Sequence, residues 1–254
     1  MSRRERPTQI CERGFDVPKL KLNPDLDVRG LALDYSKNRR VRVEGLLEEN
    51  GAKALHEFLD QHDQWWQLIN TPEGLIEMNS RTRAKMSGKS RAALDAKVYD
   101  GARRGFQYRY EGLRVPDLTQ LVHGHNDPLV AFARLMASKP MLDFLRAVTG
   151  CDELSFTDGH ATSYGPGDFL TGHDDNVAGK GRLAAYVFGL TQIWKPEWGG
   201  LLLFHGEGEA SVSGLTPRFN TLDLFAVPQR HSVSVVTPSA PVRRYAVTGW
   251  LRAA

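Results

Sequence analysis

The segment His173-Asp174-Asp175 and the later His231 carry residue types that could bind a metal ion. Alternate side chains of a strand point to one face, so a strand from Phe169 onward should turn His173 and Asp175 the same way and Asp174 the other way. Two imidazoles and one carboxylate on one side of a metal leave its other side open, as in non-haem Fe(II) sites. A lone His-x-Asp pair is weak evidence for a metal site, because it occurs by chance in many chains.

The surrounding residues form an ordered series of motifs. They are Tyr164-Gly165-Pro166-Gly167, Arg182–Leu190, Trp194–Phe204 with Gly199-Gly200, Phe219–Val227, His231–Val236 and Arg244–Trp250. The series resembles the prolyl-hydroxylase-like branch of the 2-oxoglutarate- and Fe(II)-dependent dioxygenases, and most closely the group that hydroxylates a proline of a ribosomal protein. The resemblance covers roughly residues 150–252, and several motifs in the same order are more specific than any one of them.

The resemblance implies that His173, Asp175 and His231 bind iron and that Arg244 pairs with the distal carboxylate of 2-oxoglutarate. A ferrous ion that holds a bidentate 2-oxo acid and O2 needs three protein ligands and three open positions, which agrees with this assignment. Arginine presents a carboxylate with a planar fork of donors that lysine lacks.

Strand alternation distinguishes Arg244 from its neighbour. It places Arg244, Ala246, Thr248 and Trp250 on one face and predicts that Arg243 faces outward. Tyr164 and Tyr186 are further candidates for contact with the co-substrate, against the alternative of aromatic side chains that only fill the interior.

The implied activity is oxidative decarboxylation of 2-oxoglutarate to succinate and CO2, coupled to hydroxylation of a C–H bond. Fe(II) is then the cofactor, 2-oxoglutarate and O2 are co-substrates, and L-ascorbate is an auxiliary reductant. A peptidyl proline is the favoured substrate, which makes the protein a prolyl 4- or 3-hydroxylase that acts on a cytoplasmic protein such as a ribosomal component. Tyr108, Tyr110 and Trp250 are the candidate substrate contacts.

Four alternatives remain. The enzyme could hydroxylate a small molecule or a free amino acid instead of a peptide. A cupin-like module would normally have His-x-His where this chain has His173-Asp174-Asp175, and a nucleic-acid demethylase of the same superfamily would be expected to carry a second arginine where Trp250 stands. An inactive jelly roll that serves as an interaction module is disfavoured, because the three ligands and Arg244 occur together.

Composition and pattern predict the elements that must position these residues. Residues 1–35 contain Pro7, Pro18 and Pro24 without clear periodicity, which favours a loosely held arm. Residues 36–149 contain helical patterns, one opened by Asp127-Pro128 and one stopped by Gly150. Residues 150–252 break into short apolar runs, so we expect a double-stranded β-helix (a cupin-like jelly roll), with the helices packed on its larger sheet, in one dioxygenase domain at 36–254.

Charge and cysteine content restrict the setting only mildly. The formal charge of +3 is not that of a dedicated nucleic-acid binder, and two cysteines with no long apolar run favour a cytoplasmic protein without a membrane segment. The segment 79–114 is rich in Lys and Arg with interleaved aromatic residues. It is either a flexible, solvated connector or a surface that meets RNA or an acidic protein.

Overall fold

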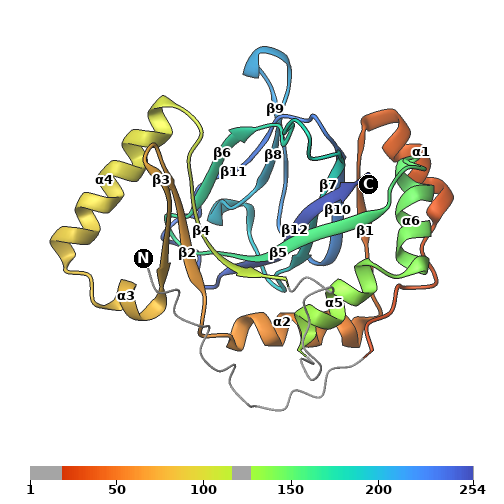
Figure 1. The fold of residues 1–254 in the computed structure, drawn as a ribbon, viewed down its shortest axis with the longest axis horizontal. Coiled ribbons are helices and arrows are strands. Elements are labelled where there is room, and N and C mark those ends of the chain that lie inside the picture. The colour runs from red at the N-terminus through yellow and green to blue at the C-terminus, as the bar shows by residue number, and fades with distance from the viewer. Residues whose placement is uncertain (1–18, 116–126, 254) are drawn as a thin grey trace.

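The computed structural model describes residues 19–115 and 127–253, and its centre is a curled antiparallel sheet (Figure 1). The strands are β1 (Arg40–Glu44), β2 (Trp66–Thr71), β3 (Gly74–Asn79), β4 (Tyr108–Arg114), β5 (Phe156–Tyr164), β6 (Phe169–His173), β7 (Arg182–Leu190), β8 (Leu202–His205), β9 (Val212–Leu215), β10 (Phe219–Ala226), β11 (His231–Val233) and β12 (Arg244–Arg252). The helices are α1 (Val28–Asn38), α2 (Glu49–Gln61), α3 (Ser80–Ala84), α4 (Gly88–Arg104), α5 (Pro128–Met136) and α6 (Lys139–Thr149), with short 3-10 turns at Pro196–Trp198 and Glu207–Glu209.

The strand order accounts for the jelly roll. Longer strands form the sequence β1-β10-β7-β12-β5, and shorter strands form β6-β11-β8-β9. Strand β4 joins the two parts, because it pairs with both β5 and β6. The predicted mainly β fold is confirmed, and the interior between the two parts of the sheet holds the candidate site.

Alternation along β12 separates two environments. Tyr245, Val247 and Leu251 enter the large hydrophobic core beneath the helices. Arg244 and Trp250, on the other face, line the interior pocket. The sequence-based assignment of the inward face of β12 is therefore confirmed.

Helices α1, α2, α5 and α6 cover the outside of the larger part of the sheet (Figure 1). The ring of Phe132 on α5 stacks on Phe188 of β7, with centroids 5.5 Å apart. The predicted helix ends are also observed: the Asp127 carboxylate accepts a hydrogen bond from the Val130 backbone N–H, and Gly150 ends α6 in the left-handed conformation. The expectation that the helices pack on the larger sheet is confirmed for these four helices, whereas α3 and α4 contact β2, β3 and β4 instead.

Part of the predicted N-terminal arm is packed against the rest of the protein. Residues 1–18 of that arm lie outside the described residues. Of the rest, Leu20 and Tyr35 are buried, and Leu22 forms an isolated bridge with Leu47. Helix α1 runs across residue 35, so the chain is already packed at the boundary that its prolines suggested.

The basic segment 79–114 is not a connector. It forms α3, α4 and β4, beside the β2–β3 hairpin (Figure 1). Val98 of α4 packs in a small core with Ile69 and Phe169. Most of its cationic side chains are exposed, because α4 buries only this narrow stripe. Among the described residues, no helix has both the length and the apolar character needed to cross a membrane.

Candidate metal centre

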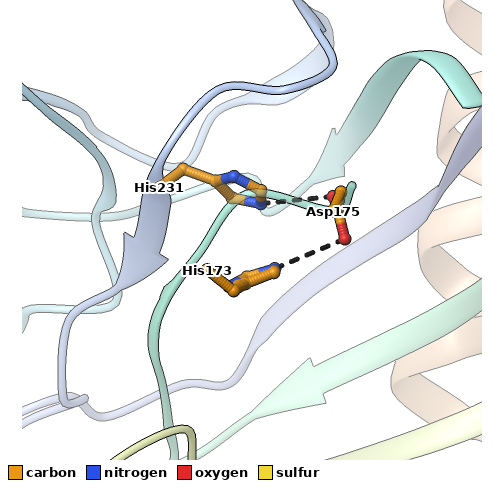
Figure 2. Close-up of side chains that lie close together, drawn as sticks. All are labelled: His173, Asp175 and His231. Carbon is orange, nitrogen blue, oxygen red and sulfur yellow. Dashed lines mark ion pairs between the residues drawn. The ribbon is translucent and has the colours of Figure 1, made fainter. Parts of the chain in front are cut away.

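Three possible metal ligands converge inside the curled sheet. His173 is the last residue of β6, His231 is the first of β11, and the two are paired across these strands. The Asp175 carboxylate faces both rings, with its oxygens 3.6 Å from His173 Nε2 and 3.5 Å from His231 Nε2. Figure 2 shows all three groups turned toward one point. One ligand atom from each residue lies within 4.8 Å of the others, close enough to share a metal ion.

Asp175 reaches this point by a route that the sequence did not predict. Strand β6 ends at His173, so strand alternation does not orient Asp175. Its backbone instead takes the left-handed conformation, with φ of 61°, which Asp tolerates better than most residues. Asp174 is exposed, and its carboxylate accepts a hydrogen bond from the Asn176 backbone N–H. The predicted pairing of His173 with Asp175 is correct, but the strand geometry given for it is wrong.

The two histidines are held in the form that binds metals. The Nδ1 atom of His173 lies 3.0 Å from the Thr171 carbonyl oxygen, and that of His231 lies 2.8 Å from the Gln229 carbonyl oxygen. An Nδ1–H that donates to a carbonyl leaves the Nε2 lone pair directed at Asp175 and the space beside it. Burial, and then the neighbouring His173, lowers the pKa of His231 to about 4, so its ring is neutral near pH 7.

Arg244 lies in the same interior pocket, which has a volume of about 420 Å³. Only 3% of Arg244 is exposed, and within the described residues it forms no ion pair and its Nε has no hydrogen-bond partner. Its guanidinium lies over the Tyr164 ring, 5.0 Å from the centroid. Burial lowers the pKa of Arg244. A buried cation without a carboxylate is costly, and an anionic ligand would offset that cost.

The two tyrosines proposed beside Arg244 differ in what their hydroxyls do. Both line the pocket. The Tyr186 hydroxyl donates a hydrogen bond to the Asp158 carbonyl oxygen at 3.1 Å, so it is already committed. The Tyr164 hydroxyl makes no hydrogen bond to any residue that the structure describes. Tyr164 is therefore the better placed of the two to bind a ligand.

Aromatic rings form much of the remaining pocket wall. The ring centroids of Tyr108 and Tyr110 lie 5.3 Å apart, and the Tyr110 ring stacks on the Tyr164 ring with centroids 5.2 Å apart. Trp250 is covered on one face by the guanidinium of Arg182, 3.6 Å from the ring centroid. The structure thus places all three predicted substrate contacts, Tyr108, Tyr110 and Trp250, on the pocket.

Sequence reasoning missed several residues of the pocket. Phe106 is half exposed, and its ring lies 5.4 Å from that of His173. The His160 Nε2 lies 3.5 Å from both the Tyr110 hydroxyl and the Thr248 hydroxyl, and burial lowers the pKa of His160. Thr248 lies on the face of β12 that strand alternation predicted to be inward, but no local pattern brings His160 to it.

Arg243 does not simply face outward. It lies on the opposite side of β12 from Arg244, as predicted, but only 33% of its side chain is exposed. Its Nη2 lies 2.7 Å from Glu111 Oε2 and 3.6 Å from Asp168 Oδ2. The prediction failed because strand alternation gives the direction of a side chain and not what packs against that face.

Asp168 lies at the buried end of this charge cluster. Its carboxylate accepts a hydrogen bond from the Gly165 backbone N–H at 2.9 Å, and its ion-pair distance to Arg109 Nε is 3.4 Å. Burial outweighs these contacts and raises the pKa of Asp168 to about 6. The cluster lies on the far side of β4 and β12 from the pocket, so it supports the strands that carry Tyr164 and Arg244.

Comparison with known families places this geometry in context. Residues 159–252, from β5 to β12, match the family model described as the 2OG-Fe(II) oxygenase superfamily. The matched region contains the three candidate metal ligands and Arg244. No curated protein matches the chain in sequence.

Solved structures share the fold at low sequence identity. A Pseudomonas putida prolyl-4-hydroxylase aligns with 89% of this chain and 99% of its own, at 17% identity and a TM-score of 0.55. A Trichoplax adhaerens prolyl hydroxylase in complex with a hypoxia inducible factor peptide fragment aligns with 89% of this chain and 88% of its own, at 14% identity and a TM-score of 0.57. The epimerase SnoN of nogalamycin biosynthesis aligns with 87% of this chain and 80% of its own, at 13% identity and a TM-score of 0.54.

Proposed function

We propose that this protein, whose residues 159–252 match the family model described as the 2OG-Fe(II) oxygenase superfamily, is a 2-oxoglutarate-dependent dioxygenase that hydroxylates a peptidyl proline. The observation that carries the proposal is the shared pocket. It contains two imidazoles and one carboxylate that could bind a metal, and a buried guanidinium that has no ion-pair partner among the described residues.

The residues present fit a ferrous ion and its co-substrate. His173, Asp175 and His231 would hold the ion through two nitrogens and a carboxylate oxygen, a donor set suited to non-haem iron. Arg244 would pair with the distal carboxylate of 2-oxoglutarate. This carboxylate would offset the cost of burying the positive charge of Arg244. Tyr164 has a free hydroxyl beside Arg244 and would donate a second hydrogen bond to that carboxylate.

Iron, 2-oxoglutarate and O2 together supply the oxidation: one oxygen atom enters the substrate C–H bond, the other enters succinate, and CO2 leaves. The protein's own part is to bind and orient. The Nδ1–H groups of His173 and His231 donate to carbonyl oxygens, which fixes each ring with its Nε2 turned toward the position that the ion would take. The rings of Tyr108, Tyr110 and Trp250 limit water and direct one C–H bond of the substrate toward the centre. We expect L-ascorbate to sustain turnover by reducing oxidised iron.

Succinate release tests this proposal. Purified protein with Fe(II) and 2-oxoglutarate should slowly release succinate without a prime substrate, because the ligands and Arg244 suffice for uncoupled turnover. His173→Ala and His231→Ala should abolish the release. His62→Gln is the matched control, since His62 follows α2 and lies outside the pocket. Undiminished release from either ligand variant would refute the iron assignment.

A peptidyl proline is the proposed substrate because the pocket wall is aromatic and partly open. Tyr108 is half-buried, so its ring could pack against a proline ring in an extended peptide. The similar prolyl hydroxylases, one of them bound to a peptide, support this choice. Exposed Arg103 and Arg104 lie just before this wall and would suit an acidic or RNA-rich surrounding such as that of a ribosomal protein.

A small-molecule substrate is the second candidate, and the similarity to an epimerase of nogalamycin biosynthesis favours it. The two proposals differ in what stimulates succinate production. Proline-containing ribosomal-protein peptides should stimulate it and gain one oxygen atom in mass, and Tyr108→Leu should weaken this effect. Trp66→Leu, an exposed tryptophan outside the pocket, is the control. Stimulation by free amino acids or metabolites alone, unchanged in Tyr108→Leu, would refute the peptide proposal while leaving the dioxygenase proposal standing.

A further inference from the structure

We infer that Arg182 is a positioning residue that holds Asp175 in the conformation in which its carboxylate can bind the metal. The inference rests on the proposed function, because it assumes that the cluster of His173, Asp175 and His231 binds a metal ion. It concerns a residue that is not itself a ligand and that acts through Asp175.

Asp175 needs support that the two histidines do not. His173 and His231 belong to paired strands, and each ring is fixed by an Nδ1 hydrogen bond to a carbonyl. Asp175 lies beyond the end of β6 with φ of 61°, a conformation that costs an L-residue about 1–2 kcal/mol. It could relax toward ordinary backbone angles and withdraw its carboxylate, so some contact must offset that cost.

Arg182 provides that contact. Its Nη1 donates a hydrogen bond to the Asp175 backbone carbonyl oxygen at 3.0 Å and lies 3.5 Å from the Asp175 Oδ1. Among the residues that the structure describes, no other group forms a hydrogen bond with Asp175. One guanidinium nitrogen therefore reaches both the backbone and the carboxylate of the same residue.

The guanidinium is itself held in place. Arg182 is the first residue of β7 and is paired with Arg252 of β12, so its backbone is fixed by the sheet. Its guanidinium carbon lies over the Trp250 ring, 3.6 Å from the ring centroid, and only 16% of the side chain is exposed. Stacking and a planar fork of donors are properties of arginine that lysine does not share.

An effect of the Arg182 charge and an effect of its positioning of Asp175 would change metal affinity in opposite directions, so mutants can distinguish them. A positive charge beside the site opposes binding of a cation. If Arg182 acted only through its charge, Arg182→Met would tighten metal binding and Arg182→Lys would leave it unchanged. If Arg182 positions Asp175, Arg182→Lys keeps the positive charge that repels the metal ion but loses the contacts that hold Asp175. Metal binding should then weaken.

The test is a Co(II) titration of metal-free protein, followed by the visible absorption of the bound ion without 2-oxoglutarate or turnover. Arg182→Lys should raise the Co(II) dissociation constant roughly 10- to 100-fold, the usual effect of losing a residue that orients a ligand, and should shift the absorption bands. Arg182→Met should bind no more tightly than the wild type. Arg252→Lys is the matched control, because Arg252 pairs with Asp158 and lies over Phe156 without touching Asp175.

Each outcome has a distinct meaning. Wild-type affinity and spectrum in Arg182→Lys, or tighter binding in Arg182→Met, would overturn the inference. A wild-type protein that binds no Co(II) would instead overturn the proposed function. Thermal unfolding of the metal-free variants shows whether they fold. If Arg182→Lys does not, Trp250→Leu keeps the charge and removes the surface beneath it, and it should weaken Co(II) binding in the same direction.

Discussion

Arg244, the first residue of β12, and Arg243, which precedes it, should give opposite results when each is replaced by methionine, which keeps most of the side-chain volume. Arg244 is buried without an ion-pair partner among the described residues, whereas Arg243 pairs with Glu111 and Asp168 on the other face of the strand. Arg244→Met should therefore lower the affinity for 2-oxoglutarate, and Arg243→Met should lower the free energy of unfolding.

For Arg244→Met, the 2-oxoglutarate carboxylate loses its buried partner. Breaking one side of such a pair costs about 2–5 kcal/mol, which corresponds to roughly 30- to 5,000-fold weaker binding. The ligand-free protein should not lose stability. Replacing a buried charge by an apolar side chain of similar volume is often neutral or stabilises a protein by about 1–4 kcal/mol. We expect the low end of that range, because the Tyr164 ring already compensates part of the charge.

For Arg243→Met, two buried carboxylates lose a partner. Removal of one partner from a fully buried pair costs about 3–5 kcal/mol. We expect about 1–3 kcal/mol here, because a third of the Arg243 side chain is exposed and each carboxylate keeps another arginine: Glu111 keeps Arg83, and Asp168 keeps Arg109. Binding of 2-oxoglutarate should stay within a few-fold of the wild type.

Anaerobic calorimetric titration of 2-oxoglutarate into the Mn(II)-loaded protein measures the affinity, and urea unfolding of the ligand-free protein measures the stability. Wild-type affinity in Arg244→Met would refute the role given to the buried guanidinium. A loss of affinity in Arg243→Met as large as in Arg244→Met would show that the two arginines are not separated by the strand as described.

Three further predictions concern other residues. Tyr164→Phe should weaken 2-oxoglutarate binding by about 1–2 kcal/mol, whereas Tyr186→Phe should change it little because that hydroxyl already bonds the Asp158 carbonyl; equal losses in the same titration would contradict this. Asp175→Ala should lose Co(II) binding and Asp174→Ala should keep it, and the reverse order would contradict the site geometry. Burial raises the folded pKa of Asp168 to about 6 from its usual 3.8, so its stabilising contribution is present below pH 3.8 and lost as the pH rises through 6. Asp168→Asn should therefore gain unfolding free energy relative to the wild type between pH 4 and pH 7, and a constant difference in urea unfolding would be the contrary result.

Part of this protein could be predicted from local sequence because the signals act over a few residues. Asp127-Pro128 and Gly150 mark helix ends through backbone hydrogen bonds and dihedral preferences that neighbouring residues set. Alternation likewise identified Arg244 and Trp250 as inward residues of β12. The family resemblance, which rests on the order of the motifs, predicted the jelly roll. It also predicted that His173 and His231 share one site.

Other features depend on contacts between distant segments and could only come from the tertiary structure. Asp175 takes a left-handed conformation and its carbonyl accepts a hydrogen bond from Arg182, and no alternation rule predicts either. The Tyr186 hydroxyl is committed because β5 places Asp158 beside it, and Arg243 is partly buried because β4 places Glu111 opposite it. The sequence by itself determined which residue types could form the site and on which strands. The tertiary structure decided which of their polar groups remain free to bind a ligand, because a group is free or committed according to partners that lie far away in the chain.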